Sequence, residues 1–257
     1  MRVLNPDYDL QRFLESVSTA SHPVLLLDYD GTLAPFCEKR DRATPYPGLR
    51  ELLSAVINQN RTRVVIISGR SIDDLLPLLA MNPPPELWGS HGLERLLPDG
   101  TRTSQELPEN TKSGLHEIIR WAAREKLDRV VELKPSGAAF HWRGLSDTDA
   151  QSLKLRIEER WATPAAQFGM ELHEFDGGLE IRIAGITKAV AVRVIITETD
   201  ANQPVAFLGD DFTDEDAFRA LSGRGLSVLV RPECRETAAD IWITPPDELV
   251  QFLGHWR

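Results

Sequence analysis

One stretch decides the fold of this chain: Val24-Leu25-Leu26-Leu27-Asp28-Tyr29-Asp30-Gly31-Thr32-Leu33. Its first four residues form a short apolar run, which is typical of a buried strand in a parallel sheet. The run ends in two aspartates, and ligands of open α/β sheets bind at the carboxyl ends of the strands. Asp28 and Asp30 therefore stand where such a sheet places its chemistry, and Gly31 lets the chain turn sharply after them. The alternative, a solvated Asp-Gly turn, does not explain the second aspartate.

Composition sets the class of protein. The 257 residues are 42% hydrophobic and 26% charged, which fits one large or two modest globular domains. The net charge of -10 and the pI near 5.1 argue against nucleic acid or an anionic membrane as a partner. Two cysteines, Cys37 and Cys234, are too few for a disulfide framework or a zinc site. We see no signal peptide and no apolar run of membrane-spanning length, so we expect a cytoplasmic protein.

Two further apolar runs also end in polar residues. Residues 63–67 precede Ser68-Gly69-Arg70, and residues 205–208 precede Gly209-Asp210-Asp211. Because the carboxyl ends of parallel strands share one sheet edge, we expect the polar groups of all three ends to gather there. They are Asp28, Asp30, Ser68, Asp210, Asp211 and Asp214. Crowded carboxylates repel one another unless a hard cation lies between them, and Mg²⁺ prefers oxygen ligands, so the pattern predicts a magnesium site.

Helices are expected between these strands. Apolar residues recur at helical spacing from Leu49 to Val56, and Pro47 suits the start of that helix. Two capping boxes are expected at helix starts, Ser71 with Asp74 and Thr213 with Asp216. A third strand is expected over residues 86–94.

Lys188 lies in the first turn of a predicted helix over residues 187–199, just before the third polar strand. A helix N-terminus is already electropositive, so a lysine there strengthens a pocket for an anion. The alternative is a plain surface lysine.

The middle of the chain, residues 107–185, follows a different pattern. It predicts a helix, two strands, a second helix and two more strands, which is an antiparallel α+β arrangement. This segment interrupts the β/α alternation of residues 1–106 and 186–257. We therefore predict a Rossmann-like α/β core with a mostly parallel sheet and an inserted α+β cap domain.

Charged residues recur two positions apart on the predicted strands of this segment. Side chains at such spacing share one face of a strand. The pairs are Glu132 with Lys134, His141 with Arg143, and Glu180 with Arg182. A sheet face of carboxylates and cations suits sugar hydroxyls, and the alternative is an ordinary solvated face.

These motifs together resemble a known superfamily. Asp28-Tyr29-Asp30-Gly31-Thr32, Ser68-Gly69-Arg70, Lys188 and Gly209-Asp210-Asp211 are similar to the four motifs of haloacid dehalogenase (HAD) phosphatases, in order. More narrowly, residues 27–35, 67–70, 91–94 (His91-Gly92-Leu93-Glu94) and 209–218 resemble trehalose-6-phosphate phosphatases. In that family, motifs similar to residues 132–134, 141–143 and 178–182 bind the disaccharide. The family usually carries Asp-Lys-Gly where this chain has Thr187-Lys188-Ala189, which leaves room for a related phosphosugar.

The resemblance implies a fold, a reaction and a set of roles. The fold would be a HAD core with a C2-type αββαββ cap, and the reaction Mg²⁺-dependent hydrolysis of trehalose 6-phosphate through an aspartyl-phosphate. The implied catalytic residues are Asp28 as nucleophile, Asp30 as acid and base, and Ser68 and Lys188 on the phosphoryl group. Those implied for the metal are Asp28, Asp30 and Asp210, with Asp211 and Asp214 acting less directly. Those implied for the substrate are Arg70, Glu132, Lys134, His141, Arg143 and Glu180. We expect a monomer whose partner is a small sugar phosphate.

Three alternatives remain open at this point. A phosphatase for another phosphosugar, such as sucrose or glucosylglycerate phosphate, would share the core and differ in the cap. A phosphomutase would return the phosphoryl group to a sugar. An inactive sugar-phosphate sensor is the third, but a binding protein has no need of the acid and base Asp30.

Overall fold

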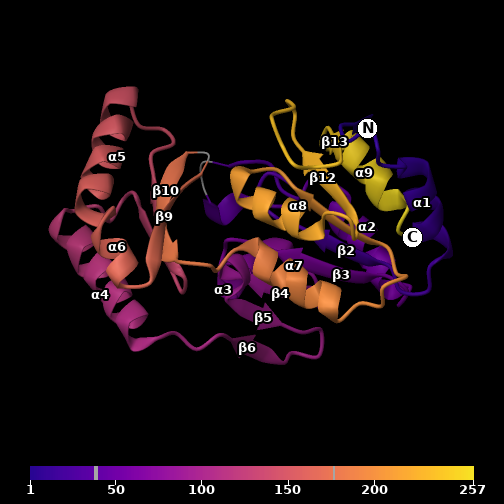
Figure 1. The fold of residues 1–257 in the computed structure, drawn as a ribbon, viewed down its shortest axis with the longest axis horizontal. Coiled ribbons are helices and arrows are strands. Elements are labelled where there is room, and N and C mark those ends of the chain that lie inside the picture. The colour runs from indigo at the N-terminus through magenta and orange to yellow at the C-terminus, as the bar shows by residue number, and fades with distance from the viewer. Residues whose placement is uncertain (38–39, 176) are drawn as a thin grey trace. The chain divides into compact units, whose positions relative to one another are not determined.

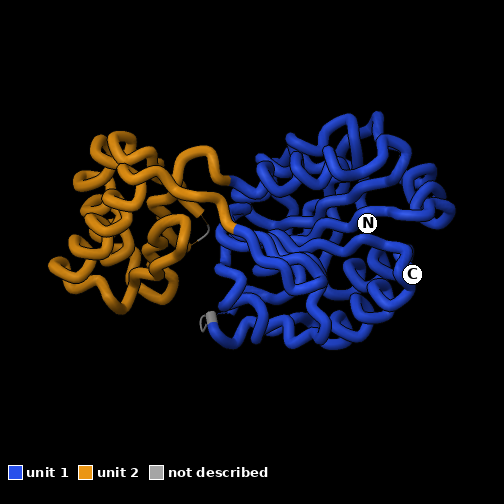
Figure 2. The backbone as a smooth tube through the Cα atoms, turned by 90° about the horizontal axis from the view of Figure 1, so that it is seen from below, with its two compact units in different colours: residues 1–103, 187–257 blue, residues 104–186 orange. Residues whose placement is uncertain are grey.

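The computed structural model describes residues 1–37, 40–175 and 177–257. Its chain divides into two compact units (Figure 2). The first consists of Met1–Thr103 and Thr187–Arg257, and the second of Ser104–Ile186. The second unit begins and ends within a few residues of the expected insertion, 107–185.

The first unit is built on a sheet whose described strands number nine, in the order β1-β13-β12-β11-β2-β3-β4-β5-β6 (Figure 1). Six neighbouring strands run parallel: β13 (Ile241–Ile243), β12 (Leu226–Val230), β11 (Val205–Gly209), β2 (Val24–Leu27), β3 (Arg63–Ile67) and β4 (Glu86–Gly89). β1 (Arg2–Val3) and β5 (Glu94–Leu96) pair antiparallel with their neighbours, and β6 (Arg102–Ser104) forms the far edge. The prediction of a mostly parallel α/β core is confirmed.

Helices cover both faces of this sheet. One face packs against α1 (Leu10–Thr19), α2 (Leu49–Asn58), α3 (Ile72–Leu79) and α9 (Asp247–Gly254). The other packs against α7 (Lys188–Thr197) and α8 (Glu215–Leu221), which lie in front of the strands in Figure 1. Leu25 and Leu27 of β2 point into the first of these cores, and Val24 and Leu26 into the second. Burial on both faces is why this strand is apolar at every position.

The expected third strand, residues 86–94, is wrong as a single element. β4 ends at Gly89, and the chain reverses through the turn Ser90–Gly92 into the antiparallel β5. Ser90 and His91 have φ of 51° and 60°, in the left-handed region, and two such residues in succession end an extended strand.

The predicted helix starts are partly right. Ser71 caps α3 as predicted, because its Oγ accepts the N–H of Asp74 at 3.2 Å. α2 begins at Leu49 with Gly48 as its N-cap residue, so Pro47 lies outside the helix. The second capping box is formed by Asp211 and Asp214, at the turn Phe212–Asp214, and the expected pair of Thr213 and Asp216 is wrong.

The second unit contains a four-stranded antiparallel sheet, counted over its described residues, in the order β7-β8-β10-β9. Its elements are α4 (Glu109–Arg124), β7 (Val131–Lys134), β8 (Gly137–His141), α5 (Asp147–Trp161), the short α6 (Pro164–Gln167), β9 (Met170–Phe175) and β10 (Gly178–Ile183). One face of the sheet packs Phe140, Leu179 and Ile181 against Trp121 of α4 and Trp161 of α5. This helix and sheet arrangement fits the predicted cap, with α6 as an addition that the sequence pattern did not indicate.

In the described part of the chain, no helix combines the length and the apolar character that crossing a membrane requires.

Candidate active site

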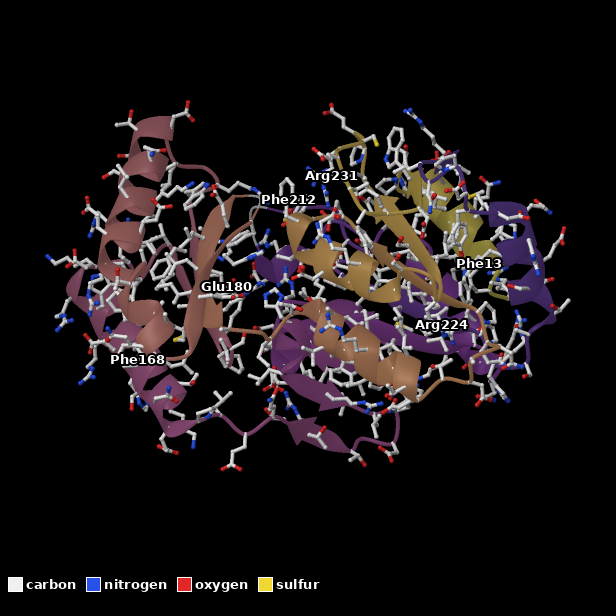
Figure 3. All side chains as sticks on the ribbon, viewed as in Figure 1. Phe13, Phe168, Glu180, Phe212, Arg224 and Arg231 are labelled. Carbon is white, nitrogen blue, oxygen red and sulfur yellow. The ribbon has the colours of Figure 1, made fainter. Side chains whose placement is uncertain are left out.

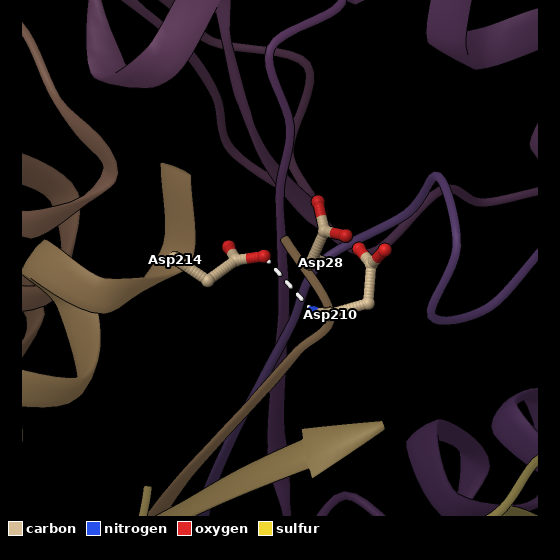
Figure 4. A group of neighbouring side chains, drawn as sticks. All are labelled: Asp28, Asp210 and Asp214. Carbon is tan, nitrogen blue, oxygen red and sulfur yellow. Dashed lines mark hydrogen bonds between the residues drawn. The ribbon is translucent and has the colours of Figure 1, made fainter. Parts of the chain in front are cut away.

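The central strands β11, β2 and β3 bring their carboxyl ends together, as predicted. Asp28 follows β2, Asp210 follows β11, and Asp214 lies four residues further on, at the end of the turn before α8. All three side chains are buried, and one carboxylate oxygen of each lies within 4.8 Å of the others (Figure 4). These three of the predicted acidic residues therefore form one cluster.

Lys188, the first residue of α7, supplies a cation to this cluster. Its Nζ lies 2.5 Å from Oδ1 of Asp28 and 2.6 Å from Oδ1 of Asp214, and its side chain is buried. Burial by itself lowers the pKa of Lys188, but the charges of Asp214 and Asp28 and their hydrogen bonds outweigh it and raise that pKa above its ordinary value. Lys188 is thus a buried ammonium group and not a plain surface lysine.

The lysine does not balance the acidic charge around it. Burial raises the pKa of Asp28 to about 7, Lys188 opposes this rise, and Asp214 adds to it. Burial also raises the pKa of Asp210 well above its ordinary value, and the charges of Asp28 and Asp214 act in the same direction. Three buried carboxylates therefore share one lysine, and a divalent cation would relieve the excess.

Asp210 is the carboxylate best placed to bind such a cation. Within the described part of the chain, neither of its carboxylate oxygens has a hydrogen-bond partner. Arg231 Nη1 lies 3.9 Å from Oδ2, beyond hydrogen-bond distance. A buried carboxylate without hydrogen bonds is costly unless another partner is present, and oxygen ligands are those that Mg²⁺ prefers. The residues present thus fit a magnesium ion.

Asp214 differs from Asp210, because both of its oxygens are already engaged. Oδ1 binds Lys188, and Oδ2 accepts the backbone N–H groups of Asp210 at 3.0 Å and Asp211 at 3.1 Å. Asp211 Oδ1 in turn accepts the N–H of Phe212 at 2.8 Å. Asp214 and Asp211 therefore hold the turn that carries Asp210.

Two glycines allow this close packing. A Cβ on Gly31 would lie 2.2 Å from Oδ2 of Asp210, and the φ of Gly31 is +84°. A Cβ on Gly209 would lie 2.5 Å from Cγ of Asp214. Real Cβ contacts are longer than either distance, so both motifs need glycine for space, and Gly31 also for its backbone conformation.

Asp30 and Arg70 form an ion pair that the sequence did not predict. Nε and Nη2 of Arg70 donate to Oδ2 and Oδ1 of Asp30 at 2.7 and 2.6 Å, a bidentate geometry. Ser68 is buried, and its Oγ accepts the N–H of Arg70 at 3.1 Å. Asp30, the predicted acid and base, is thus held by Arg70, which was predicted to bind substrate.

The motif from His91 to Glu94 supports this loop. His91 N–H donates to the carbonyl of Ser68 at 3.0 Å, and Ser90 N–H donates to that of Arg70 at 2.7 Å. The His91 ring lies so close to Gly69 that a Cβ there would be 2.6 Å from its Cε1. The turn Ser90–Gly92 is therefore part of the structure that positions Ser68; Gly92, with a φ of +111°, is a sequence signal for this turn, whereas the left-handed backbone of Ser90 and His91 has none.

The predicted sugar-binding residues lie in the second unit. Glu132 of β7 and Glu180 of β10 both pair in register with Ala139 of β8, which places them on one face of the sheet. Lys134 Nζ lies 3.0 Å from Oε1 of Glu180, which Figure 3 labels on β10, and 3.6 Å from Oε1 of Glu132. His141 Nε2 is 2.9 Å from Oε2 of Glu132. The strand β8 ends at His141, so the expectation that Arg143 repeats the strand pattern is wrong.

Solved structures with the same architecture define the class of fold. The C-terminal domain of trehalose-6-phosphate phosphatase from C. albicans has a TM-score of 0.82 at 20% identity and covers 100% of this chain and 99% of its own. A haloacid dehalogenase-like hydrolase from Bacteroides thetaiotaomicron has a TM-score of 0.65 at 18% identity and covers 91% and 98%. The chain has the HAD-like α/β fold. The family model of trehalose-phosphatases matches residues 26–240, and the chain belongs to this family.

Curated relatives share much of this chain. The trehalose-phosphate phosphatase of Mycobacterium ulcerans (strain Agy99) is 28% identical over 250 residues, which are 92% of this chain and 62% of that protein. An uncharacterized glycosyl hydrolase of Mycobacterium tuberculosis (strain H37Rv) is 29% identical over 253 residues, 94% of this chain and 19% of that protein. The chain thus spans about a fifth to three fifths of the length of these relatives.

Proposed function

We propose that this chain is a phosphomonoester hydrolase that removes the phosphate of trehalose 6-phosphate and needs Mg²⁺. The observation that carries the proposal is the buried Lys188 between Asp28 and Asp214, beside the carboxylate of Asp210, which accepts no hydrogen bond from the residues that the structure describes. This arrangement combines a nucleophile, a fixed cation and a place for a second cation, which phosphoryl transfer requires. Membership of the trehalose-phosphatase family supports the choice of substrate.

Asp28, Asp210 and the backbone carbonyl of Asp30 would hold the Mg²⁺. When bound, the ion would offset negative charge on the phosphoryl oxygens. Asp214 and Asp211 would act indirectly, since their oxygens already hold Lys188 and the backbone of the turn.

In the first step, a carboxylate oxygen of Asp28 forms a bond to phosphorus while the bond from phosphorus to the sugar oxygen breaks. Asp30 gives its proton to that leaving oxygen, so the sugar departs with a free hydroxyl. In the second step, water attacks the phosphorus of the aspartyl-phosphate and Asp30 takes its proton. The bond between Asp28 and phosphorus breaks, phosphate leaves, and Asp28 is again a free carboxylate.

The remaining core residues would keep the nucleophile ionised, bind the phosphoryl oxygens and orient the acid and base. Lys188 opposes the rise in the pKa of Asp28 that burial causes, and so favours the ionised nucleophile. Lys188 and Ser68 would hold phosphoryl oxygens, because this chemistry depends mainly on positioning and electrostatics. Arg70 stays a proposed substrate contact, and its bidentate pair with Asp30 adds a role in orienting the acid and base.

Recognition of the sugar would belong to the polar sheet face of the second unit. Its carboxylates and cations offer acceptors and donors for hydroxyl groups, and Glu180 and Lys134 already form an ion pair there. The proposed contacts are Glu132, Lys134, His141, Arg143 and Glu180.

The test is phosphate release from a panel of sugar phosphates, namely those of trehalose, sucrose, glucosylglycerate and glucose, with Mg²⁺ and with a chelator. We expect release from trehalose 6-phosphate in Mg²⁺ at a kcat/KM well above that for the others, and none with the chelator. Preference for another member of the panel would reassign the substrate, and a sugar bisphosphate product would indicate a mutase. Binding of sugar phosphates without release from any of them would contradict the proposal.

A further inference from the structure

The segment between β12 and β13 reaches back to the turn that carries Asp210. Nη2 of Arg235 donates to the carbonyl of Asp211 at 2.8 Å and to that of Asp210 at 3.2 Å, and Nε adds a 3.3 Å contact to Asp210. Arg231, labelled in Figure 3 after β12, donates Nη1 to the same Asp210 carbonyl at 3.3 Å. The guanidinium of Arg235 thus binds two successive carbonyl groups.

The same two residues are held from their amide side by a different group. Oδ2 of Asp214 accepts the N–H groups of Asp210 and Asp211. The backbone of the turn therefore binds a carboxylate through its donors and an arginine through its acceptors. Since the Asp210 carboxylate accepts no hydrogen bond from the described residues and its ion pair with Arg231 is 3.9 Å long, its position depends mainly on this fixed backbone.

Arg235 is itself fixed by contacts outside the acidic cluster. Its Nη1 donates to Oε1 of Glu215 at 2.5 Å and to the carbonyl of Glu236 at 2.8 Å. Glu215 also accepts from the hydroxyl of Thr237 and the N–H of Ala238, both at 2.8 Å. The guanidinium lies 4.7 Å from the centre of the Phe212 ring, and its side chain is 14% exposed. A planar group with this many partners has little freedom left.

We propose that Arg235 is a positioning residue for the Mg²⁺ site: by binding the carbonyls of Asp210 and Asp211, it holds the Asp210 carboxylate where the cation binds. The inference rests on the proposed function, because it takes Asp210 to be a metal ligand. Contacts that orient a ligand typically change metal affinity or activity by about 10- to 100-fold when they are lost. A lysine cannot replace the arginine, since a single ammonium group lacks the fork that spans two carbonyls.

The experiment compares the whole chain with Arg235→Lys, Arg235→Gln and the control Arg219→Gln. Arg219 lies on α8 near the same turn, is 63% exposed and pairs with Asp216. Mg²⁺ affinity is measured without substrate, by calorimetry and by the rise in Tm on adding the metal, and kcat and KM for an aryl phosphate are measured against Mg²⁺ concentration. We expect both Arg235 variants to bind Mg²⁺ about 10- to 100-fold more weakly. Their kcat should fall at low Mg²⁺ and recover at high Mg²⁺, with the control unchanged.

A role in stability alone makes a different prediction, namely a lower Tm with unchanged Mg²⁺ affinity, and that result would overturn the inference. If the Arg235 variants fail to fold, Glu215→Gln takes their place. It weakens the contact that orients Arg235, and we expect a smaller loss of Mg²⁺ affinity in the same direction; wild-type affinity would overturn the inference. If the wild-type protein binds no Mg²⁺ at all, the proposed function fails and the inference with it. If wild type binds Mg²⁺ and the variants bind it equally well, only the role of Arg235 fails.

Discussion

Replacing Lys188 by methionine tests the electrostatic balance of the cluster. Methionine fills a similar volume but carries no charge, so Asp28 and Asp214 lose the cation that lies 2.5 and 2.6 Å from them. Breaking a buried ion pair by removing one partner typically costs about 3–5 kcal/mol, because the remaining charge is buried and uncompensated. Since Lys188 serves two carboxylates, we expect a loss in the free energy of unfolding at the upper part of this range. Lys112→Met, which removes an exposed pair with Glu109, should hardly change the free energy of unfolding, because solvent screens that pair.

The loss depends on pH with a definite sign. Burial already raises the folded-state pKa of Asp28 from 3.8 to about 7, and without Lys188 the force opposing this rise is gone. A carboxyl group whose pKa is raised on folding destabilises the folded state when it must ionise. That penalty is absent below its ordinary pKa near 3.8 and complete above its folded pKa. The variant should therefore be least stable relative to wild type above the still higher folded-state pKa of its own Asp28, and the difference should shrink as the pH falls from there toward 7, because below about pH 7 Asp28 is protonated in both folded proteins.

The assay is urea unfolding at pH 5 and pH 8 in the presence of a chelator, followed by circular dichroism. Added Mg²⁺ should restore part of the stability of Lys188→Met, because a second cation can balance the same carboxylates. Phosphate release should fall by orders of magnitude, since the phosphoryl group loses its fixed cation. A variant as stable as wild type at pH 8, or one that loses stability equally at both pH values, would show that Lys188 does not balance the charge of Asp28.

Three further predictions test other parts of the site. Exhaustive chelation should abolish phosphate release and re-added Mg²⁺ should restore it, because Asp28 and Asp210 cannot approach an anionic substrate without a cation; full activity in chelator would contradict this. Glu132→Ala or Glu180→Ala should lower kcat/KM for trehalose 6-phosphate by roughly 10- to 100-fold, because each variant loses a hydrogen bond between a charged group and the sugar, and such a loss typically has an effect of this size. Hydrolysis of an aryl phosphate should hardly change, and an equal fall for both substrates would remove these residues from sugar recognition. Gly31→Ala should abolish activity and lower Tm, since its methyl group would lie 2.2 Å from Oδ2 of Asp210 at a φ of +84°; a fully active variant would show that the turn adapts.

Much of the core was predictable from the sequence, because a strand that is buried on both faces needs apolar residues at successive positions, and such a run is easily recognised. The strands β2, β3 and β11 are packed on both faces, so each reads as an unbroken apolar run, and the polar residues that follow them mark the sheet edge. The place of Lys188 was also predictable, because the order of helices and strands puts the start of its helix beside that sheet edge.

The contacts between these segments were not predictable in the same way. The pair of Arg70 with Asp30 joins residues 40 positions apart, and side-chain partners at such separation leave no periodic signal. The two overlapping candidates for a capping box, Asp211 with Asp214 and Thr213 with Asp216, have the same spacing, and only the path of the chain after β11 chooses between them. The reversal at Ser90 and His91 uses left-handed backbone at residues that rarely adopt it, and although Gly89 and Gly92 flank it, the apolar and polar pattern of residues 86–94 carried the expected strand through both.

In the proposed mechanism, Asp28 carries the phosphoryl group between substrate and water. Phosphate release from trehalose 6-phosphate in Mg²⁺ is compared between wild type and Asp28→Asn, and acid-quenched protein is analysed for a phosphorylated peptide that contains residue 28. We expect turnover and a transient phosphoryl adduct on Asp28 in wild type, and neither in a folded Asp28→Asn variant, because an amide is a poor nucleophile. Steady-state turnover by a clean Asp28→Asn preparation, or an adduct on another residue of the wild type, would contradict it.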